Sequence, residues 1–315
     1  MDARLDRPSY LRPHIAADLV RRAAQAVAHL ACCRACPRDC GVDRTHGAEG
    51  VCQTGRLARV ASAFAHFGEE SCLVGTNGSG TIFFGRCNLA CVFCQNADIS
   101  QQTAGQALDA RSIAERMLGL QNAGCHNINF VSPSHVVPQI LEAVAAAVPR
   151  GLRVPLVYNS NAYDSVETLA QLDGVIDIYM PDFKFWTPAS AARYCQAEDY
   201  PARARAALRE MHRQVGDLRI DARGIARRGL LVRHLVMPGL QGESAEILHW
   251  LASELSPDTF VNLMAQYRPA HRVGGHLIRA EKGAGFSEIN RPVRPDEMEQ
   301  AFATARNAGL HRFAD

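Results

Sequence analysis

The sequence has 315 residues, of which 47% are hydrophobic and 21% are charged, and its formal net charge is +2. Such a composition is ordinary for a globular protein, and the small net charge gives no reason to expect a nucleic-acid or membrane partner. No apolar run reaches the roughly 18 residues of a transmembrane helix, and residues 1–14 lack a signal-peptide core, so we expect a cytoplasmic protein.

Two regions follow one another along the chain. Residues 1–75 are predicted to form a small cysteine-rich module that contains a helix over 16–30. Six apolar segments of strand type then follow, at 80–85, 127–132, 155–160, 177–182, 230–239 and 259–267. Helical segments are predicted at 110–121, 135–148, 165–172, 189–215, 243–255 and 295–308.

Continuous apolar runs are typical of parallel strands buried on both faces, so the alternation predicts an α/β fold with a parallel sheet covered by helices. The pattern alone does not choose between an open doubly wound sheet and a complete or partial barrel. We divide the chain into the N-terminal module (1–75), a barrel domain (76–290) and a C-terminal helix (291–315). In either architecture, chemistry gathers at the carboxyl ends of the strands, where polar residues stand here.

The sequence contains eleven cysteines, and seven of them fall into two tight groups. In a reducing compartment disulfides are rare, so grouped cysteines indicate metal ligands. We interpret the other four as inert, partly buried thiols: Cys32, Cys72, Cys125 and Cys195.

The segment GRCNLACVFCQN follows the first predicted strand and contains Cys87, Cys91 and Cys94. Three thiolates on a short loop can hold three irons of a [4Fe–4S] cluster, which leaves one iron open to a small-molecule ligand. Zinc normally takes a fourth protein ligand unless the site is catalytic.

This spacing, with the aromatic Phe93 before the last cysteine, resembles the radical SAM superfamily. The resemblance implies a partial (β/α)6 barrel of the TIM type and a [4Fe–4S] cluster whose open iron binds S-adenosylmethionine (SAM). It implies reductive cleavage of SAM to a 5′-deoxyadenosyl radical that abstracts hydrogen from a substrate. It also implies an electron donor such as flavodoxin or ferredoxin.

Several other segments, among them CPRDCGVDRTHGAEGVC, NFVSPSH, LVYNSNAYD, DIYMPDFKF and NLMAQYRP, look like PflX-type proteins, which are relatives of the pyruvate formate-lyase activating enzyme. Activating enzymes hold the SAM amino group with a GGE-type motif, and NFVSPSH stands in its place here. The resemblance implies that the cofactors are contacted by Phe93 of the cysteine loop and by strand-end and neighbouring residues: Ser132, Ser134, Asn159, Ser160, Asp182, Lys184, Arg233 and Gln266.

Other roles remain open for some of these residues. The two serines of NFVSPSH can simply cap the next helix. Asp182 and Lys184 point to the same face of a strand and can form an ordinary ion pair. Arg233 and His234 must face opposite ways, and we expect Arg233 to point inward.

The second cysteine group comprises Cys33, Cys36, Cys40 and Cys52. Four cysteines within twenty residues can close a site completely, as in structural zinc sites, and they can equally hold all corners of an auxiliary [4Fe–4S] cluster. His46 lies inside the loop and is an alternative ligand.

We predict an enzyme that takes hydrogen from a small-molecule or peptide substrate. The alternative is an activating enzyme that generates a glycyl radical on a partner protein. The insertion after Cys94 is short, and the long helical segment over 183–219 is suited to shape a substrate pocket, which favours the first reading.

Overall fold

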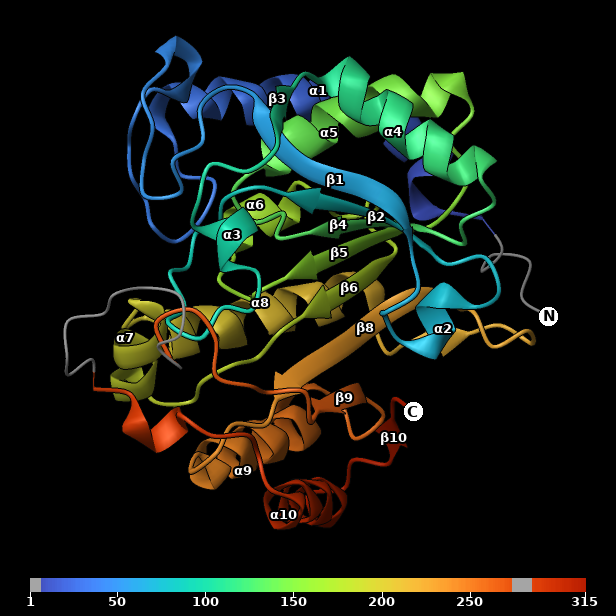
Figure 1. The fold of residues 1–315 in the computed structure, drawn as a ribbon. Helices are drawn as coiled ribbons and strands as arrows, with labels where there is room; N and C mark the ends of the chain where they lie inside the picture. The colour runs from blue at the N-terminus through green and yellow to red at the C-terminus, as the bar shows by residue number, and fades with distance from the viewer. Residues whose placement is uncertain (1–6, 274–284) are drawn as a thin grey trace.

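Residues 7–273 and 285–315 are described by a computed structural model, and within them the strands form one curved sheet (Figure 1). The order across the sheet is β10, β9, β8, β6, β5, β4, β2, β1, β3, and β7 pairs with β8. The strands are β1 (Ala58–His66), β2 (Ser79–Phe84), β3 (Gln106–Leu108), β4 (Ile128–Val131), β5 (Leu156–Ser160), β6 (Ile178–Pro181), β7 (Arg219–Ile220), β8 (Ala226–Leu235), β9 (Phe260–Met264) and β10 (Arg312–Phe313).

Six adjacent strands, β2, β4, β5, β6, β8 and β9, are parallel and follow one another in chain order. A doubly wound sheet reverses its strand order at a switch point, and these six strands show no reversal. Right-handed crossovers then place the connecting helices on one face, which leaves the other face concave. The predicted α/β fold with a partial (β/α)6 barrel is therefore confirmed, and all six predicted strands are present.

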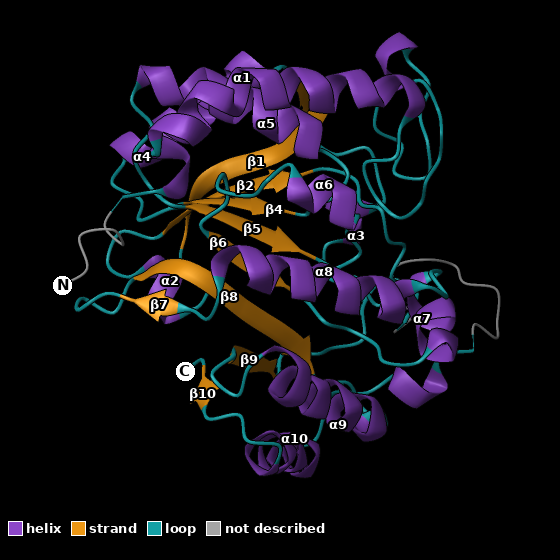
Figure 2. Cartoon of the chain, turned by 180° about the vertical axis from the view of Figure 1, so that it is seen from behind, coloured by secondary structure: helices purple, strands orange, loops and turns teal. Residues whose placement is uncertain are grey.

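Helices cover the convex face: α6 and α8 lie behind the strands in Figure 1 and in front of them in Figure 2. Ile140 of α5 and Met211 of α8 belong to the same buried core cluster as Tyr158 and Tyr179 of the sheet. The helices are α1 (Pro13–Ala28), α2 (Ser71–Val74), α3 (Ala97–Ser100), α4 (Ala110–Asn122), α5 (Val137–Ala147), α6 (Val166–Ala170), α7 (Pro188–Cys195), α8 (Tyr200–Val215), α9 (Gln241–Trp250) and α10 (Pro295–Asn307).

The prediction of one helical stretch over 189–215 was wrong, because α7 and α8 are separate helices. Gln196 ends α7 with a left-handed φ of 55°. Pro201 lies in the first turn of α8, where a residue without an N–H group is tolerated.

The short helix α2 fills the amino-terminal part of the concave face. Its residues Cys72 and Leu73 pack against Val157, Ile178 and Leu231, which belong to three neighbouring strands. The carboxyl ends of the strands remain available for a site.

The N-terminal region contacts the barrel in two ways. Helix α1 packs against α5, and β1 pairs antiparallel with β2, so residues 58–66 belong to the main sheet. The division at residue 75 stays a prediction, and residues 1–6 and 274–284 of the predicted module and barrel lie outside the described residues. Across residues 7–273 and 285–315, no helix combines the length and apolarity that crossing a membrane requires.

Candidate functional site

Cys87, Cys91 and Cys94 lie in the loop after β2, at the edge toward which the parallel strands point (Figure 1). Neighbouring elements hold the loop from two sides. Val92 N donates to the Tyr194 carbonyl of α7 at 2.9 Å, and Gln101 Nε2 donates to the Cys91 carbonyl at 3.0 Å. The main chain of the loop is thereby fixed before any ligand binds.

Each of the three sulfur atoms has a polar neighbour. Asn161 Nδ2 donates to Cys87 Sγ at 3.3 Å. Cys94 Sγ lies 3.2 Å from Ser100 Oγ, and Cys91 Sγ lies 3.4 Å from Cys195 Sγ. Hydrogen bonds to sulfur are among the interactions that stabilise and tune thiolate ligands of iron–sulfur clusters.

These thiols stay protonated in the ligand-free chain. Burial raises the pKa of Cys87 to about 12 and also raises the pKa of Cys94, while for Cys91 the contact with Cys195 is the largest cause of a raised pKa. A bound metal replaces such protons. Within the described residues, no three His, Cys, Asp or Glu side chains stand in metal-ligand positions, so binding requires these side chains to turn toward a common centre. The soft sulfur donors themselves fit an iron–sulfur cluster.

Phe93 belongs to the cysteine loop itself, and the residue is 5% exposed. Its ring centroid is 6.0 Å from that of Phe185 and 6.1 Å from that of Tyr267. Two aromatic rings from distant parts of the chain thus anchor the cysteine loop through Phe93.

Several of the predicted strand-end residues stand in one row. Ser132 N donates to the Asn159 carbonyl at 3.0 Å, and Asp182 N donates to the Ser160 carbonyl at 2.9 Å. Phe183 N donates to the Arg233 carbonyl at 2.8 Å. The row runs along the carboxyl edge of four neighbouring strands, and Ser132 carries a left-handed φ of 59°, a strained backbone that is typical of ligand sites.

Asp182 and Lys184 form an ion pair, with Lys184 Nζ 2.6 Å from Asp182 Oδ2. Burial alone lowers the pKa of Lys184, but the charge and hydrogen bond of Asp182 outweigh it and raise this pKa above its ordinary value. The ammonium group is therefore charged and lies within electrostatic reach of a cysteine of the loop.

Ser160 and Ser134 face the helix side of the sheet. Ser160 Oγ and Tyr158 OH each donate to the carboxyl group of Asp164 at 2.7 Å. Burial raises the pKa of Asp164, and these hydrogen bonds oppose that shift. Ser134 is 2% exposed and lies beside the same carboxyl group.

Arg233 points to the concave face, where its guanidinium pairs with Glu69 and with both carboxylate oxygens of Glu70. His234 points the other way, toward Ser244 of α9 at 2.8 Å. Asn262 Nδ2 also donates to Glu70, at 2.7 Å. Arg233 thus reaches the barrel interior, and two carboxylates are already paired with it there.

Gln266 has an exposed side chain, and its carbonyl accepts a hydrogen bond from Gln95 of the cysteine loop at 3.0 Å.

Four residues at the site were not predicted from the sequence: Asn161, Cys195, Glu69 and Glu70. Asn161 stands two residues beyond Asn159 at a predicted strand end, and this position was a usable signal. The other three depend on contacts between distant segments.

The second cysteine group lines a separate small cavity of about 10 Å³. Cys33, Cys36, Cys40 and Cys52 all line it, together with Arg44 and His135. His46 does not line it; its side chain is 86% exposed and lies 2.7 Å from Asp43.

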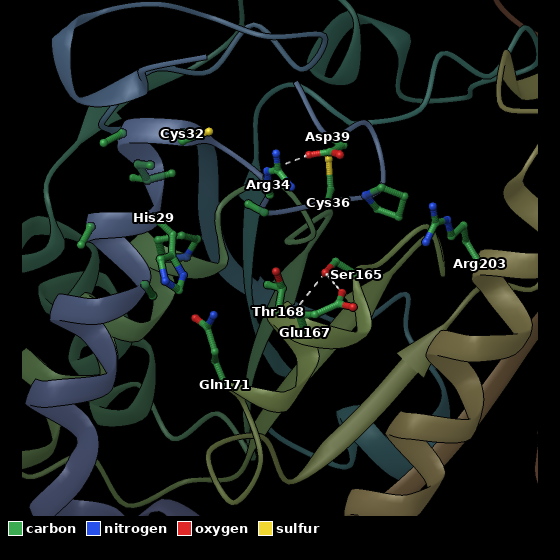
Figure 3. A pocket seen from close by; sticks show the side chains of 17 residues that line it. His29, Cys32, Arg34, Cys36, Asp39, Ser165, Glu167, Thr168, Gln171 and Arg203 are labelled. Atoms are coloured by element: carbon green, nitrogen blue, oxygen red, sulfur yellow. Dashed lines mark hydrogen bonds and ion pairs between the residues drawn. The ribbon is translucent and has the colours of Figure 1, made fainter. Parts of the chain in front are cut away.

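A larger pocket of about 740 Å³ lies between the end of α1 and α6 (Figure 3). His29, Cys32, Asp39 and Glu167 line it, and Cys36 lines both this pocket and the small cavity. None of the three cysteines of the loop after β2 lines it, so this pocket is separate from the row of strand ends.

Comparison with known proteins gives one family match. The model described as Radical SAM superfamily matches residues 81–251, which is more than half of the chain. An uncharacterized protein of Methanocaldococcus jannaschii is 29% identical over 289 residues, which cover 90% of this chain and 77% of that protein.

Two solved structures resemble the fold at low identity. Streptococcus suis SuiB bound to the precursor peptide SuiA has a TM-score of 0.47 and 12% identity, over 73% of this chain and 46% of SuiB. The protein anSMEcpe with bound AdoMet and the Cp18Cys peptide has a TM-score of 0.46 and 8% identity, over 73% of this chain and 60% of that one. This chain therefore spans less than two thirds of either protein.

Proposed function

This chain belongs to the radical SAM superfamily of enzymes, and from that premise we propose that Cys87, Cys91 and Cys94 ligate a [4Fe–4S] cluster used for reductive cleavage of SAM. The observation that carries the proposal is the place of these cysteines, on a fixed loop at the carboxyl edge of the parallel strands. When bound, such a cluster supplies the electron that breaks SAM into methionine and a 5′-deoxyadenosyl radical.

The residues of the chain itself bind and orient SAM. Lys184, charged and beside Cys91, is suited to bind the SAM carboxylate, and Asp182 orients the ammonium group. Ser132 and Asn159 stand next in the row and offer hydroxyl and amide groups. Phe93 anchors the loop against Phe185 and Tyr267. Gln266 is held next to the loop because its carbonyl accepts a hydrogen bond from Gln95.

Three of the predicted SAM contacts, Ser134, Ser160 and Arg233, act in this proposal by positioning other residues. Ser134 and Ser160 surround Asp164 and hold the loop that carries Asn161, which in turn reaches Cys87. Arg233 lies on the concave face, where it forms ion pairs with Glu69 and Glu70. We propose that these three position the ligand site.

We further propose a PflX-type enzyme that acts on a small-molecule or peptide substrate, with flavodoxin or ferredoxin as electron donor. The sequence motifs support the subtype. The substrate class is supported by α7, since this helix of the long insertion contacts the cysteine loop and forms one wall of the site.

Anaerobic reconstitution with iron and sulfide, followed by SAM and a strong reductant, tests the proposal. Wild type should form 5′-deoxyadenosine, and a variant with Cys87→Ala, Cys91→Ala and Cys94→Ala should not. Cys32→Ala, an exposed cysteine outside both groups, is the control and should behave as wild type. Equal product from wild type and the triple variant would refute the proposal.

A further inference from the structure

The four cysteines of the N-terminal region enclose a space of atomic size. We propose that Cys33, Cys36, Cys40 and Cys52 hold a single tetrahedral metal ion of the zinc class, and that this ion fixes the N-terminal loops against the loop of Cys87, Cys91 and Cys94. The inferred metal site does not depend on the proposed function. Only its effect on the loop of Cys87, Cys91 and Cys94 rests on that function.

Cavity size separates the two kinds of centre that the spacing allows. The cavity of about 10 Å³ has room for roughly one water-sized sphere. A cubane core of several iron and sulfide atoms needs much more space. In the described residues these cysteines, like those of the other group, do not stand in metal-ligand positions, so binding requires their side chains to turn inward. Four sulfur atoms can close around a single ion by such rotations, as in tetrathiolate zinc sites, whereas a cubane would also require the surrounding loops to move apart.

Local backbone structure brings the four thiols around this space. Cys33 N donates to the Val42 carbonyl at 3.0 Å, and Gly41 N donates back to the Cys33 carbonyl at 2.9 Å. Gly41 has a left-handed φ of 64°, which glycine adopts without strain. Val51 N donates to Cys40 Sγ at 3.4 Å, so one sulfur already accepts a backbone hydrogen bond.

Gly50 shows how closely the chain approaches this sulfur. A Cβ atom at Gly50 would lie 2.7 Å from Cys40 Sγ, so a side chain there would displace the thiol. The loop is shaped around the position of the sulfur atom.

The charge at the cavity points to a negatively charged centre. Arg44 is 1% exposed and donates to the carbonyls of Gly55 and His135, and its Nη1 lies 3.6 Å from Cys33 Sγ. Among residues 7–273 and 285–315, no carboxylate pairs with it. A buried cation needs a counter-charge, and four thiolates around a divalent ion carry net negative charge.

His135 provides a second unexplained buried group. It is fully buried and lines the cavity, and its Nδ1 has no hydrogen-bond partner in the part of the chain that the structure describes. Its Nε2 lies 3.2 Å from the Gly85 carbonyl, which directly precedes the cysteine loop. Four sulfur atoms already complete a tetrahedral site, so His135 lines the proposed ion site without being one of its ligands.

Arg38 connects this site with the other cysteines. It lies between Cys36 and Cys40, and its guanidinium donates to the Asn88 carbonyl at 2.8 Å and to the Gln196 carbonyl at 2.7 Å. Asn88 follows Cys87, and Gln196 follows Cys195. An ion that fixes the loop of Arg38 therefore also fixes both segments that surround Cys87 and Cys91.

The first experiment uses the full-length chain with Cys87→Ala, Cys91→Ala and Cys94→Ala, which removes the other metal site. We expect about one zinc per chain and no acid-labile sulfide. After zinc removal under anaerobic conditions, Co²⁺ should bind with the visible absorption of a tetrahedral thiolate complex, and Zn²⁺ should displace it. Iron with labile sulfide in this variant, or no bound metal, would overturn the inference. Neither result bears on 5′-deoxyadenosine formation by wild type.

Single substitutions in that background identify the ligands. Cys36→Ala should abolish the cobalt absorption, while Cys32→Ala should keep it, because Cys32 does not line the small cavity. Loss of the absorption in both variants, or in neither, contradicts the assignment.

The link to the second loop is tested with Arg38→Gln in the otherwise natural chain. We expect it to keep its zinc and to hold the reconstituted cluster less tightly, by about the tenfold that outer-shell partners contribute. Arg34→Gln is the matched control, since Arg34 is 71% exposed and, within the described part of the chain, its one ion pair is with Asp39, at 3.3 Å. Equal iron retention after desalting in the two variants would refute the link.

Discussion

Cys195 Sγ lies 3.4 Å from Cys91 Sγ, so a thiol at the end of α7 contacts one of the proposed cluster ligands. From the sequence, Cys195 was interpreted as an inert thiol, and the structure places it, fully buried, beside the site. A hydrogen bond to a ligand sulfur stabilises the more negative, reduced state of a cluster. The contact therefore bears on redox behaviour as well as on packing.

Replacing this thiol should change the cluster without removing it. In Cys195→Ala we expect near-normal iron content, a more negative reduction potential and a loss of roughly 10- to 100-fold in 5′-deoxyadenosine formation. A redox titration followed by electron paramagnetic resonance measures the potential. Cys125→Ala removes a similarly buried thiol elsewhere and should leave the potential unchanged. The same potential in both variants would show that Cys195 only fills space.

Lys184 offers a prediction that separates ligand binding from stability. Its side chain is 13% exposed and that of Asp182 is 23% exposed, so Lys184→Met leaves a largely buried carboxylate unpaired. We expect a loss of about 1–3 kcal/mol in the free energy of unfolding, between the values for exposed and buried pairs. We also expect weaker SAM binding, measured by equilibrium dialysis.

The double variant Asp182→Asn with Lys184→Met distinguishes the two effects. It removes both charges, so most of the stability should return while SAM binding stays weak. If SAM binds equally well to Lys184→Met and wild type, Lys184 does not contact SAM and the ion pair is only structural.

The parallel strands and the cysteine loop were predictable because both signals are local. Apolar runs mark buried strands, and polar residues at their ends mark the edge where Asn159 and Asp182 stand. Strand β1 was missed because its segment ARVASAFAH is rich in alanine, which has low strand propensity, and because it pairs antiparallel with both of its neighbours, β2 and β3, outside the parallel series.

The pairing of Arg233 with Glu69 and Glu70 could not be read from the sequence. These residues are more than 160 positions apart, and the two glutamates precede a helix of only four residues. Their place depends on β1, which delivers α2 to the concave face. Inward orientation of Arg233 followed from strand alternation, whereas its partners follow only from the tertiary fold.

This buried charge cluster gives a stability prediction. Arg233→Gln should cost about 3–5 kcal/mol in the free energy of unfolding, because it leaves two largely buried carboxylates without a cation. Arg111→Gln is the control: Arg111 is 82% exposed in its pair with Glu115, and its loss should cost at most about 1 kcal/mol. Urea unfolding of the two variants measures the difference, and similar values would show that the cluster contributes no more than a surface pair.

Asp177 gives a prediction for pH. It is buried between the N-terminal segment and the start of β5, where its carboxyl group accepts hydrogen bonds from Ser9 N at 2.7 Å and Leu156 N at 3.1 Å. Burial raises its pKa from 3.8 to about 6, although these hydrogen bonds and the charge of Arg228 oppose the shift. Between about pH 4 and pH 6, the folded chain therefore keeps a proton that the unfolded chain has lost.

Stability must then fall as pH rises through this window, because the state that binds more protons is favoured at lower pH. The full penalty, on the order of 3 kcal/mol, is reached above pH 6, where the folded state must also carry the buried charge. Asp177→Asn cannot ionise, so its stability relative to wild type should increase from pH 4 to pH 6 and then stay constant. Its loss of one acceptor adds only an offset that does not depend on pH.

Urea unfolding at several pH values between 4 and 7 measures this relative stability. Asp98→Asn, which replaces an exposed aspartate, is the matched control and should show no such trend. A parallel pH dependence of wild type and Asp177→Asn would mean that the buried carboxyl group keeps its ordinary pKa. In that case, the two backbone hydrogen bonds and Arg228 compensate fully for the burial of the charge.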